Sequence, residues 1–133
     1  MANGFTNIVE QGLLTQLLIG TPFADPTPVK VSLHTADPGN SGANEVVGGS
    51  YARIQVDTDK WTVPDSIGTG SASSNVEDLE FVDMPETTVA YAGIWSNDGF
   101  VFLMSGPLDS GGTPVSGGAT FAIRAGKLRA KLN

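Results

Sequence analysis

The hydrophobic pattern near the N-terminus is helical. Residues 5–19 place apolar side chains three and four positions apart, which predicts one amphipathic helix. Asn3 or Asn7 can cap its start, and Gly20 followed by Pro22 ends it. A glycine in the middle of the pattern weakens the helix, so we expect it to depend on packing against another surface.

After this segment the pattern changes to a period of two, which is typical of strands. Residues 27–35 alternate between apolar and polar side chains and predict a strand with one buried face, with His34 on the polar face. Residues 36–50 are rich in glycine, asparagine and proline and predict a long surface loop. Further strands are predicted at residues 51–56, 60–63, 76–82, 88–96, 100–106, 119–125 and 127–133.

The order of these elements predicts the fold class. About eight short strands behind one helix, without strand–helix alternation, favour a mainly β fold. We expect a single jelly-roll-like antiparallel β-sandwich with one N-terminal amphipathic helix. Residues 1–20 would form the helix as a docking or capping arm, and residues 21–133 the β-sandwich domain.

Composition agrees with one folded domain and excludes several classes of partner. The 133 residues are 40% hydrophobic and 16% charged, with a net charge of −7. An acidic chain repels nucleic acid and anionic lipid, and its longest apolar run is too short to span a bilayer. There is no cysteine, which rules out disulfides and cysteine-ligated metals. We expect neither nucleic acid nor membrane as a partner.

Charge is unevenly distributed along the chain. Residues 1–109 hold all fourteen acidic side chains and three basic ones, a net charge of −11. The remaining basic side chains follow this region, at Arg124, Lys127, Arg129 and Lys131. An acidic body with a basic end predicts head-to-tail contacts between copies, or contacts with an acidic neighbour.

No motif of an enzyme or a metal site emerges. His34 is the one histidine, and no nucleophile elbow accompanies it, so a surface or turn-bonding role is favoured over catalysis. Two acidic stretches, residues 57–65 and 77–86, could bind Ca²⁺ but lack the spacing of a Ca²⁺ loop, which favours a solvated face or a subunit contact. We therefore predict no catalytic residue, no cofactor and no metal.

Several segments resemble one family along almost the whole chain. They are ANGFTNIVEQGLLTQLL at the start, Leu33 to Pro38, Gly48 to Arg53, VEDLEFVDMPETTVAYAGIWSNDG (76–99) and SGGATFAIRAGKLRAKL (116–132). In these segments the chain resembles short bacteriophage structural proteins labelled tail fibre, head fibre or capsid decoration proteins. The resemblance implies a non-enzymatic virion component present in many copies and assembled in the host cytoplasm.

Two functions follow from this resemblance. The leading one is a capsid decoration protein that binds the outer capsid surface as a homotrimer and stabilises capsomer contacts, with the major capsid protein or another virion protein as partner. The alternative is a tail-fibre or baseplate adhesin that recognises a host-surface glycan through loops 36–50 and 107–118. The predicted partner-binding residues are Phe5, Leu13 and Leu17 of the helix with Arg124, Lys127, Arg129 and Lys131 of the basic end.

Overall fold

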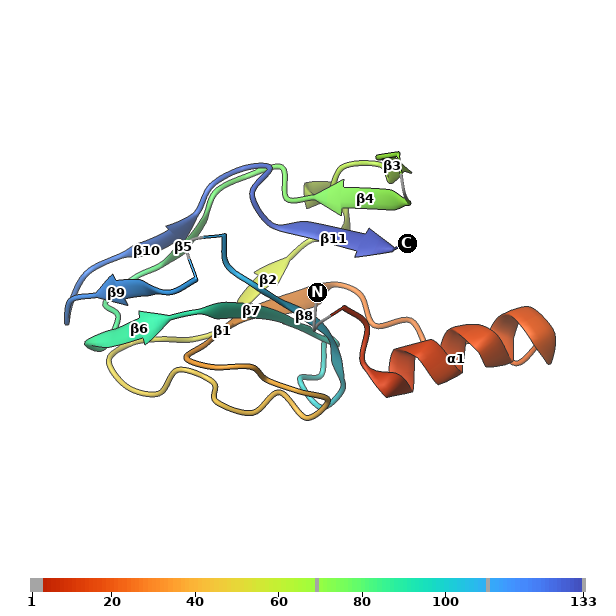
Figure 1. The fold of residues 1–133 in the computed structure, drawn as a ribbon, viewed down its shortest axis with the longest axis horizontal. Helices are drawn as coiled ribbons and strands as arrows, with labels where there is room; N and C mark the ends of the chain where they lie inside the picture. Colours follow the sequence, from red (N-terminus) through yellow and green to blue (C-terminus); the bar gives the residue numbers. More distant parts are fainter. Residues whose placement is uncertain (1–3, 69, 110, 133) are drawn as a thin grey trace.

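The computed structural model describes residues 4–68, 70–109 and 111–132, and Figure 1 gives the element labels. The elements are α1 (Asn7–Leu18), β1 (Val29–His34), β2 (Ile54–Val56), the 3₁₀ helix η1 (Thr58–Lys60), β3 (Asp65–Ser66), β4 (Ser71–Ser74), β5 (Leu79–Phe81), β6 (Thr87–Val89), β7 (Tyr91–Trp95), β8 (Phe102–Pro107), β9 (Thr113–Val115), β10 (Phe121–Ile123) and β11 (Arg129–Leu132).

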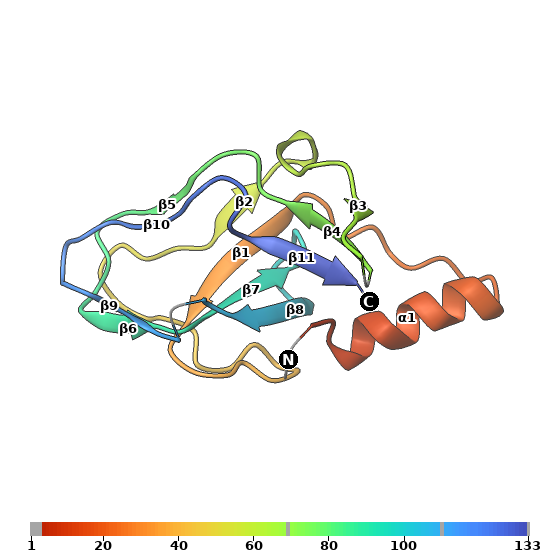
Figure 2. The same cartoon turned by 45° about the horizontal axis from the view of Figure 1, so that its top comes forward.

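The strands form one larger sheet and several small ones, all antiparallel. The larger sheet has the order β2-β1-β7-β8, and the small sheets are β10-β5, β11-β4-β3 and β6-β9. In Figures 1 and 2, β11, β4 and β3 lie over one face of the larger sheet, and α1 projects from the end where both termini lie. The mainly β prediction with antiparallel sheets and one N-terminal helix is confirmed. The jelly-roll strand order stays a prediction.

Several strands differ from the predicted ones. Residues 60–63 form no strand, because the chain turns through η1 and only Trp61 makes an isolated bridge to Asn75. The sequence SASS of β4 has no apolar alternation, and its strand state comes from pairing with β11 on one side and β3 on the other. Likewise, β9 lies within the glycine-rich stretch predicted to be loop. Tertiary pairing overrides local preference at these places.

The main core lies between the larger sheet and the small ones. Val31 and Leu33 of β1 are fully buried and project onto the same face of the sheet as Ala92 of β7. They pack with Phe81 of β5 and Val115 of β9 in one cluster. A second cluster, built on Val9, Ile94 and Leu103, joins the helix to the sheet.

The opposite face of β1 is also buried, which the strand pattern did not predict. Ser32 and His34 are both 0% exposed, so the expected surface position of His34 is wrong. The cause is the loop that follows, which folds back along β1. Its Asn44 carbonyl accepts from the Thr35 N–H at 2.9 Å, and its Val46 N–H donates to the Leu33 carbonyl at 3.0 Å.

Asn75 is a buried polar residue that organises the turn into β11. It is 1% exposed. Its Nδ2 donates to the carbonyls of Glu77 (2.8 Å) and Arg124 (3.1 Å), and its Oδ1 accepts from the Leu128 N–H at 3.0 Å. One side chain thereby links the neighbouring Glu77 to two backbone groups that are distant in sequence, which fixes where β11 begins.

Replacing this side chain should therefore destabilise the fold. The variant Asn75→Ala removes three hydrogen bonds of a buried side chain, and we expect the free energy of unfolding to fall by about 1–3 kcal/mol. Urea unfolding followed by circular dichroism measures this loss. The control Asn97→Ala removes an amide from an exposed turn and should cost less than about 1 kcal/mol. Equal losses in the two variants would contradict the role assigned to Asn75.

Candidate interaction site

The first turn of the helix is anchored to β8. Thr6 is buried, its N–H donates to the Leu103 carbonyl at 2.9 Å, and its Oγ1 donates to the Phe102 carbonyl at 2.7 Å. Phe5 adds an isolated bridge to Met104. Thr6 is the N-cap residue in place of Asn7, and Asn3 lies outside the described residues. The helix therefore has a fixed root on the sheet.

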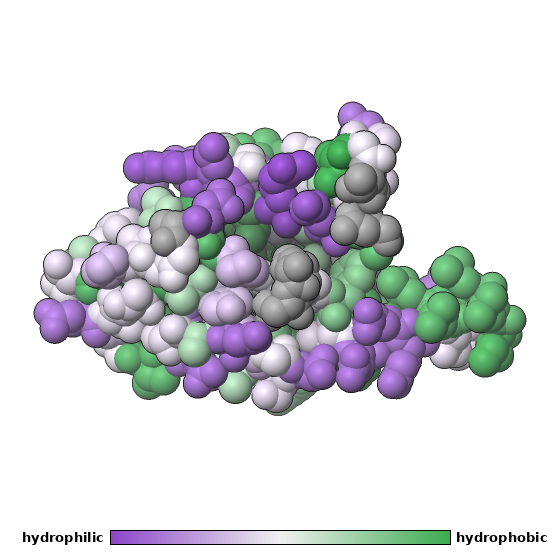
Figure 3. Space-filling view, in the orientation of Figure 1, coloured by the Kyte–Doolittle hydropathy of each residue, from purple (hydrophilic) through white to green (hydrophobic). Residues whose placement is uncertain are grey.

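The far half of the helix projects away from the body. Val9 is its one buried residue. Beyond it, apolar side chains face solvent: Leu14 is 56%, Leu17 78%, Leu18 79% and Ile19 77% exposed. Figure 3 shows hydrophobic surface covering this projecting end. Contiguous exposed apolar surface of this kind is typical of an interaction site.

The predicted helix stripe is thus divided between two environments. Phe5 and Leu13 are partly buried against the cluster that joins helix and sheet, whereas Leu17 lies in solvent. Phe23 lies in the chain that returns from the helix and packs against the helix. Its N–H donates to Gln16 Oε1 at 3.1 Å. Gly12 makes room for this ring, because a Cβ at Gly12 would lie 2.1 Å from a Phe23 ring carbon.

An apolar groove of about 340 Å³ opens at the root of the helix, between the two layers of strands. The helix side contributes Phe5, Val9, Leu13 and Phe23; the larger sheet contributes Val29, Ile94 and Met104; the opposite layer contributes Trp61, Ser73 and Ala130. None of the described residues that line the groove is charged. Here the apolar faces of the two layers are only partly covered: Val9 and Ile94 are buried, whereas Trp61 and Ala130 keep some exposure.

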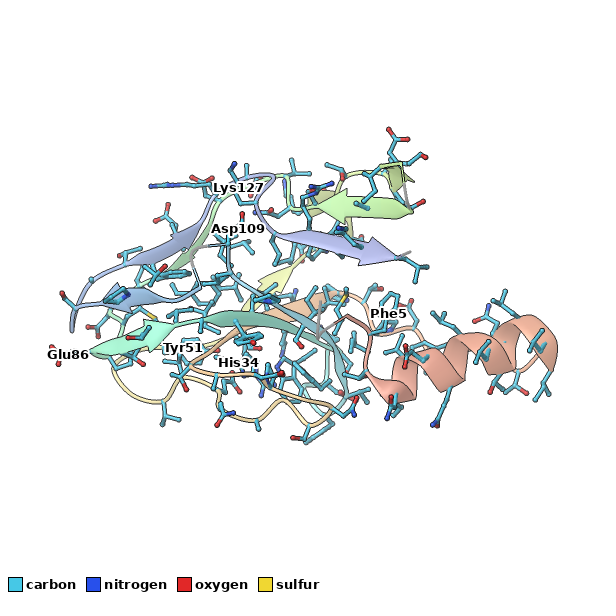
Figure 4. All side chains as sticks on the ribbon, viewed as in Figure 1. Phe5, His34, Tyr51, Glu86, Asp109 and Lys127 are labelled. Atoms are coloured by element: carbon cyan, nitrogen blue, oxygen red, sulfur yellow. The ribbon has the colours of Figure 1, made fainter. Side chains whose placement is uncertain are left out.

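The basic end of the chain borders this groove. β11 contributes Ala130 to the lining, and its neighbours Arg129 and Lys131 are exposed. Lys127, in the turn before β11, is exposed as well, and Figure 4 labels it. Among the described contacts none of these three cations forms an ion pair. Leu132, in the same strand, is 54% exposed.

Arg124 has a partner within its own chain. Its Nη1 lies 3.0 Å from Asp78 Oδ2. Two hydrogen bonds lower the pKa of the Asp78 carboxyl below its ordinary value. The larger effect comes from the Ala125 N–H and the smaller one from the Arg124 guanidinium. Both side chains remain in solvent contact, so this ion pair contributes little to stability. Of the four basic residues predicted to bind a partner, Arg124 thus forms an ion pair within its own chain, whereas the other three form none among the described contacts.

His34, the one residue considered for catalysis, is sealed inside the protein. The Trp95 indole N–H donates to Ser32 Oγ at 2.9 Å, and Ser32 Oγ lies 2.7 Å from His34 Nε2. His34 Nδ1 lies 2.8 Å from the Ala43 carbonyl. Since a carbonyl only accepts, Nδ1 carries the proton and Nε2 accepts from Ser32. The predicted turn-bonding role is confirmed, and no substrate reaches this serine–histidine pair.

Beside this network, a charged cluster ties the loop to the sheet. Arg53 donates to Glu45 from Nε (2.9 Å) and Nη2 (2.8 Å), and its guanidinium stacks on the Trp95 ring at 3.8 Å. The Tyr51 hydroxyl donates to the same carboxylate at 2.7 Å and accepts from the Leu33 N–H. Burial raises the pKa of Glu45, but the bonds from Arg53 and Tyr51 outweigh it and lower the pKa. Sequence analysis did not single out this cluster.

The acidic stretches show no arrangement of metal ligands. In the described part of the chain, no three histidine, cysteine or acidic side chains come together as a metal site. One member of these stretches, Glu77, pairs instead with Lys60 at 2.9 Å. No helix among the described residues has the length and apolar character needed to cross a bilayer.

The buried imidazole predicts how stability depends on pH. Burial lowers the pKa of His34 below its ordinary value of 6.5. Above pH 6.5 both the folded and the unfolded chain carry a neutral histidine; below it, only the unfolded chain takes up the proton. The free energy of unfolding should therefore fall as the pH drops below 6.5, by up to about 1.4 kcal/mol per pH unit.

Urea unfolding between pH 7.5 and 5.0 measures this slope, and His34→Gln is the control. The variant is expected to be less stable at every pH, but its free energy of unfolding should be nearly flat over this range. Glu45, whose pKa is lowered, adds its own loss only as the pH falls below its ordinary value of 4.5. An unchanged slope in His34→Gln would overturn the assignment.

Comparison with known proteins adds a family to these observations. A search of curated proteins finds no match to the chain. A family model described as "Podophage GP4 fiber I protein gp80" matches residues 4–131, which includes the helix, both layers of strands and the groove between them. Because this match covers nearly the whole chain, the protein belongs to the podophage GP4 fiber I protein gp80 family.

Proposed function

We propose that the protein is a structural subunit of a phage fibre and that it attaches to a neighbouring virion protein through the projecting helix and the apolar groove. The observation that carries this proposal is the family match, whose description names a fibre protein and covers residues 4–131. The exposed leucines and the open groove support attachment, since such surfaces are stabilised when a partner covers them.

This proposal reverses the order of the two functions expected from sequence. Capsid decoration was the leading expectation, whereas the family description favours the fibre alternative. The homotrimer stays a prediction. A non-enzymatic role is supported by the fibre family and by the inaccessible Ser32–His34 pair.

The contact surface of this proposal keeps the helix that was predicted to bind a partner and differs from the loops that the adhesin alternative named. Loop 36–50 was expected to recognise the host surface, but its Ala43, Asn44 and Val46 backbone groups are bonded to the β1 region. The apolar side chains of the helix end have no such engagement. We therefore infer attachment within the virion in preference to glycan recognition by this loop.

Labelling intact virions tests the location. An antibody fragment raised against the purified protein should bind the fibres when labelled particles are imaged by electron microscopy. A phage lacking the gene serves as the control for unspecific label. Label distributed over the whole head would contradict the fibre proposal and return the decoration function to first place.

Incorporation into virions tests the surface. A phage carrying Leu17→Gln and Leu18→Gln should hold several-fold less of this protein per particle, measured by quantitative mass spectrometry, because polar amides weaken burial in a partner. Val47→Gln is the matched control, since Val47 is 87% exposed but lies outside the helix and the groove. Equal incorporation of both variants would exclude the helix end as the attachment surface.

A further inference from the structure

The projecting helix end and the groove are chemically alike. Leu17 and Leu18 belong to none of the buried clusters of the described residues, and between Gln11 and Ala24 the sequence holds no charged side chain. The groove is also uncharged and opens to solvent. Each surface therefore gains from contact with an apolar surface of similar size.

A copy cannot fill its own groove with its own helix end. The root of the helix is held to β8 by the two hydrogen bonds of Thr6, and Phe23 braces it at Gly12. From this root the helix extends about 18 Å over its twelve residues. Figures 1 and 2 both show it pointing away from the strands. The helix end that fills a groove must therefore belong to another copy.

Charge favours a second copy of this chain as the occupant of the groove. The arm that carries the helix, residues 4–28, holds two carboxylates, Glu10 and Asp25, and no basic side chain. The strand region that borders the groove, residues 127–132, holds three basic side chains and no acidic one. Glu10 lies in the first turn of the helix and Asp25 in the chain that returns from it, so the helix end itself is uncharged and the acidic charge of the arm lies behind it. The arm of one copy and the basic strand of another thus carry opposite charges, whereas most other surfaces of a chain with net charge −7 repel each other.

We propose that the helix end of one copy occupies the groove of a second copy, with Leu17 and Leu18 against the apolar lining and the acidic arm beside Arg129 and Lys131. Such a contact is heterologous, because each copy gives its helix end to one neighbour and accepts another in its groove. Repetition of the contact produces a closed ring or a linear assembly. This inference rests on the proposed function, because it names a second copy as the partner of the same helix and groove.

Directed cross-linking tests the geometry, and the absence of native cysteine gives a clean background. Leu18→Cys and Ala130→Cys are made as two separate proteins, mixed, and oxidised. We expect a disulfide-linked heterodimer between helix end and groove, in higher yield than either homodimer. Val47→Cys is the control for random collision, because its side chain is exposed away from both surfaces. A heterodimer yield no greater than the control, or preferential Leu18→Cys homodimers, would overturn the proposal.

Sedimentation velocity over a concentration series tests the energetics without any cross-link. The wild-type protein should associate as its concentration rises, and the double variant Leu17→Gln, Leu18→Gln should raise the Kd by at least about tenfold. Val47→Gln should match the wild type. Circular dichroism verifies that the variants are folded, which is expected because these side chains lie in solvent. A wild-type protein that remains monomeric throughout would overturn the proposal and leave a different virion protein as the occupant.

Complementation between two defective variants separates this contact from a helix-to-helix dimer. The helix variant Leu17→Gln, Leu18→Gln keeps an intact groove, and Ala130→Glu blocks the groove but keeps an intact helix end. Each alone should be monomeric, while the mixture should form one-to-one dimers. If the Ala130→Glu variant alone still assembles like the wild type, the groove does not bind the helix end and the proposal is wrong. The double variant Arg129→Glu, Lys131→Glu, on exposed positions, should weaken association most at low salt.

Discussion

The burial of β1 on both faces is the constraint on which the rest of the structure depends. One face supplies Val31 and Leu33 to the main core, and the other carries Ser32 and His34, both without solvent contact. Buried polar groups are costly unless they are paired. The loop after β1 therefore has to fold back to offer the Ala43 carbonyl, and the sheet has to place Trp95 within reach of Ser32.

That requirement explains features that otherwise look unrelated. Gly93 lies opposite Ser32 in the sheet, and a Cβ there would approach the Phe102 ring to 2.6 Å and Ser32 Oγ to 2.8 Å. The returning loop also positions Glu45, whose bonds from Arg53 and Tyr51 lower its pKa. The arrangement resembles a catalytic serine–histidine pair in its distances but is a structural element, because the groups are closed to any substrate.

The same architecture leaves the other end of the molecule incomplete. The main core fills the space between the layers near the middle of β1, whereas beside Ile94 and Met104 the layers enclose an open groove. A helix of twelve residues is marginal by itself in water, and only its root packs here. The chain belongs to a fibre family and exposes both an apolar helix end and an apolar groove. Burial of these two surfaces in an assembly would add to the stability of the protein.

The sequence by itself determined the helix near residues 5–19, the strand at 27–35, the mainly β class and the likeness to phage structural proteins, because periodicity and local motifs are properties of neighbouring residues. It could not place β3, β4 and β9, because these short segments lack an alternating apolar pattern and become strands by pairing: β4 with the distant β11, β9 with β6, and β3 with β4. It assigned His34 to the surface, since a strand pattern does not reveal what covers the second face. Phe5, Leu13 and Leu17 were recognised as one stripe, but only the tertiary structure decided which of them pack and which face solvent, because burial depends on how far the helix extends beyond the sheet.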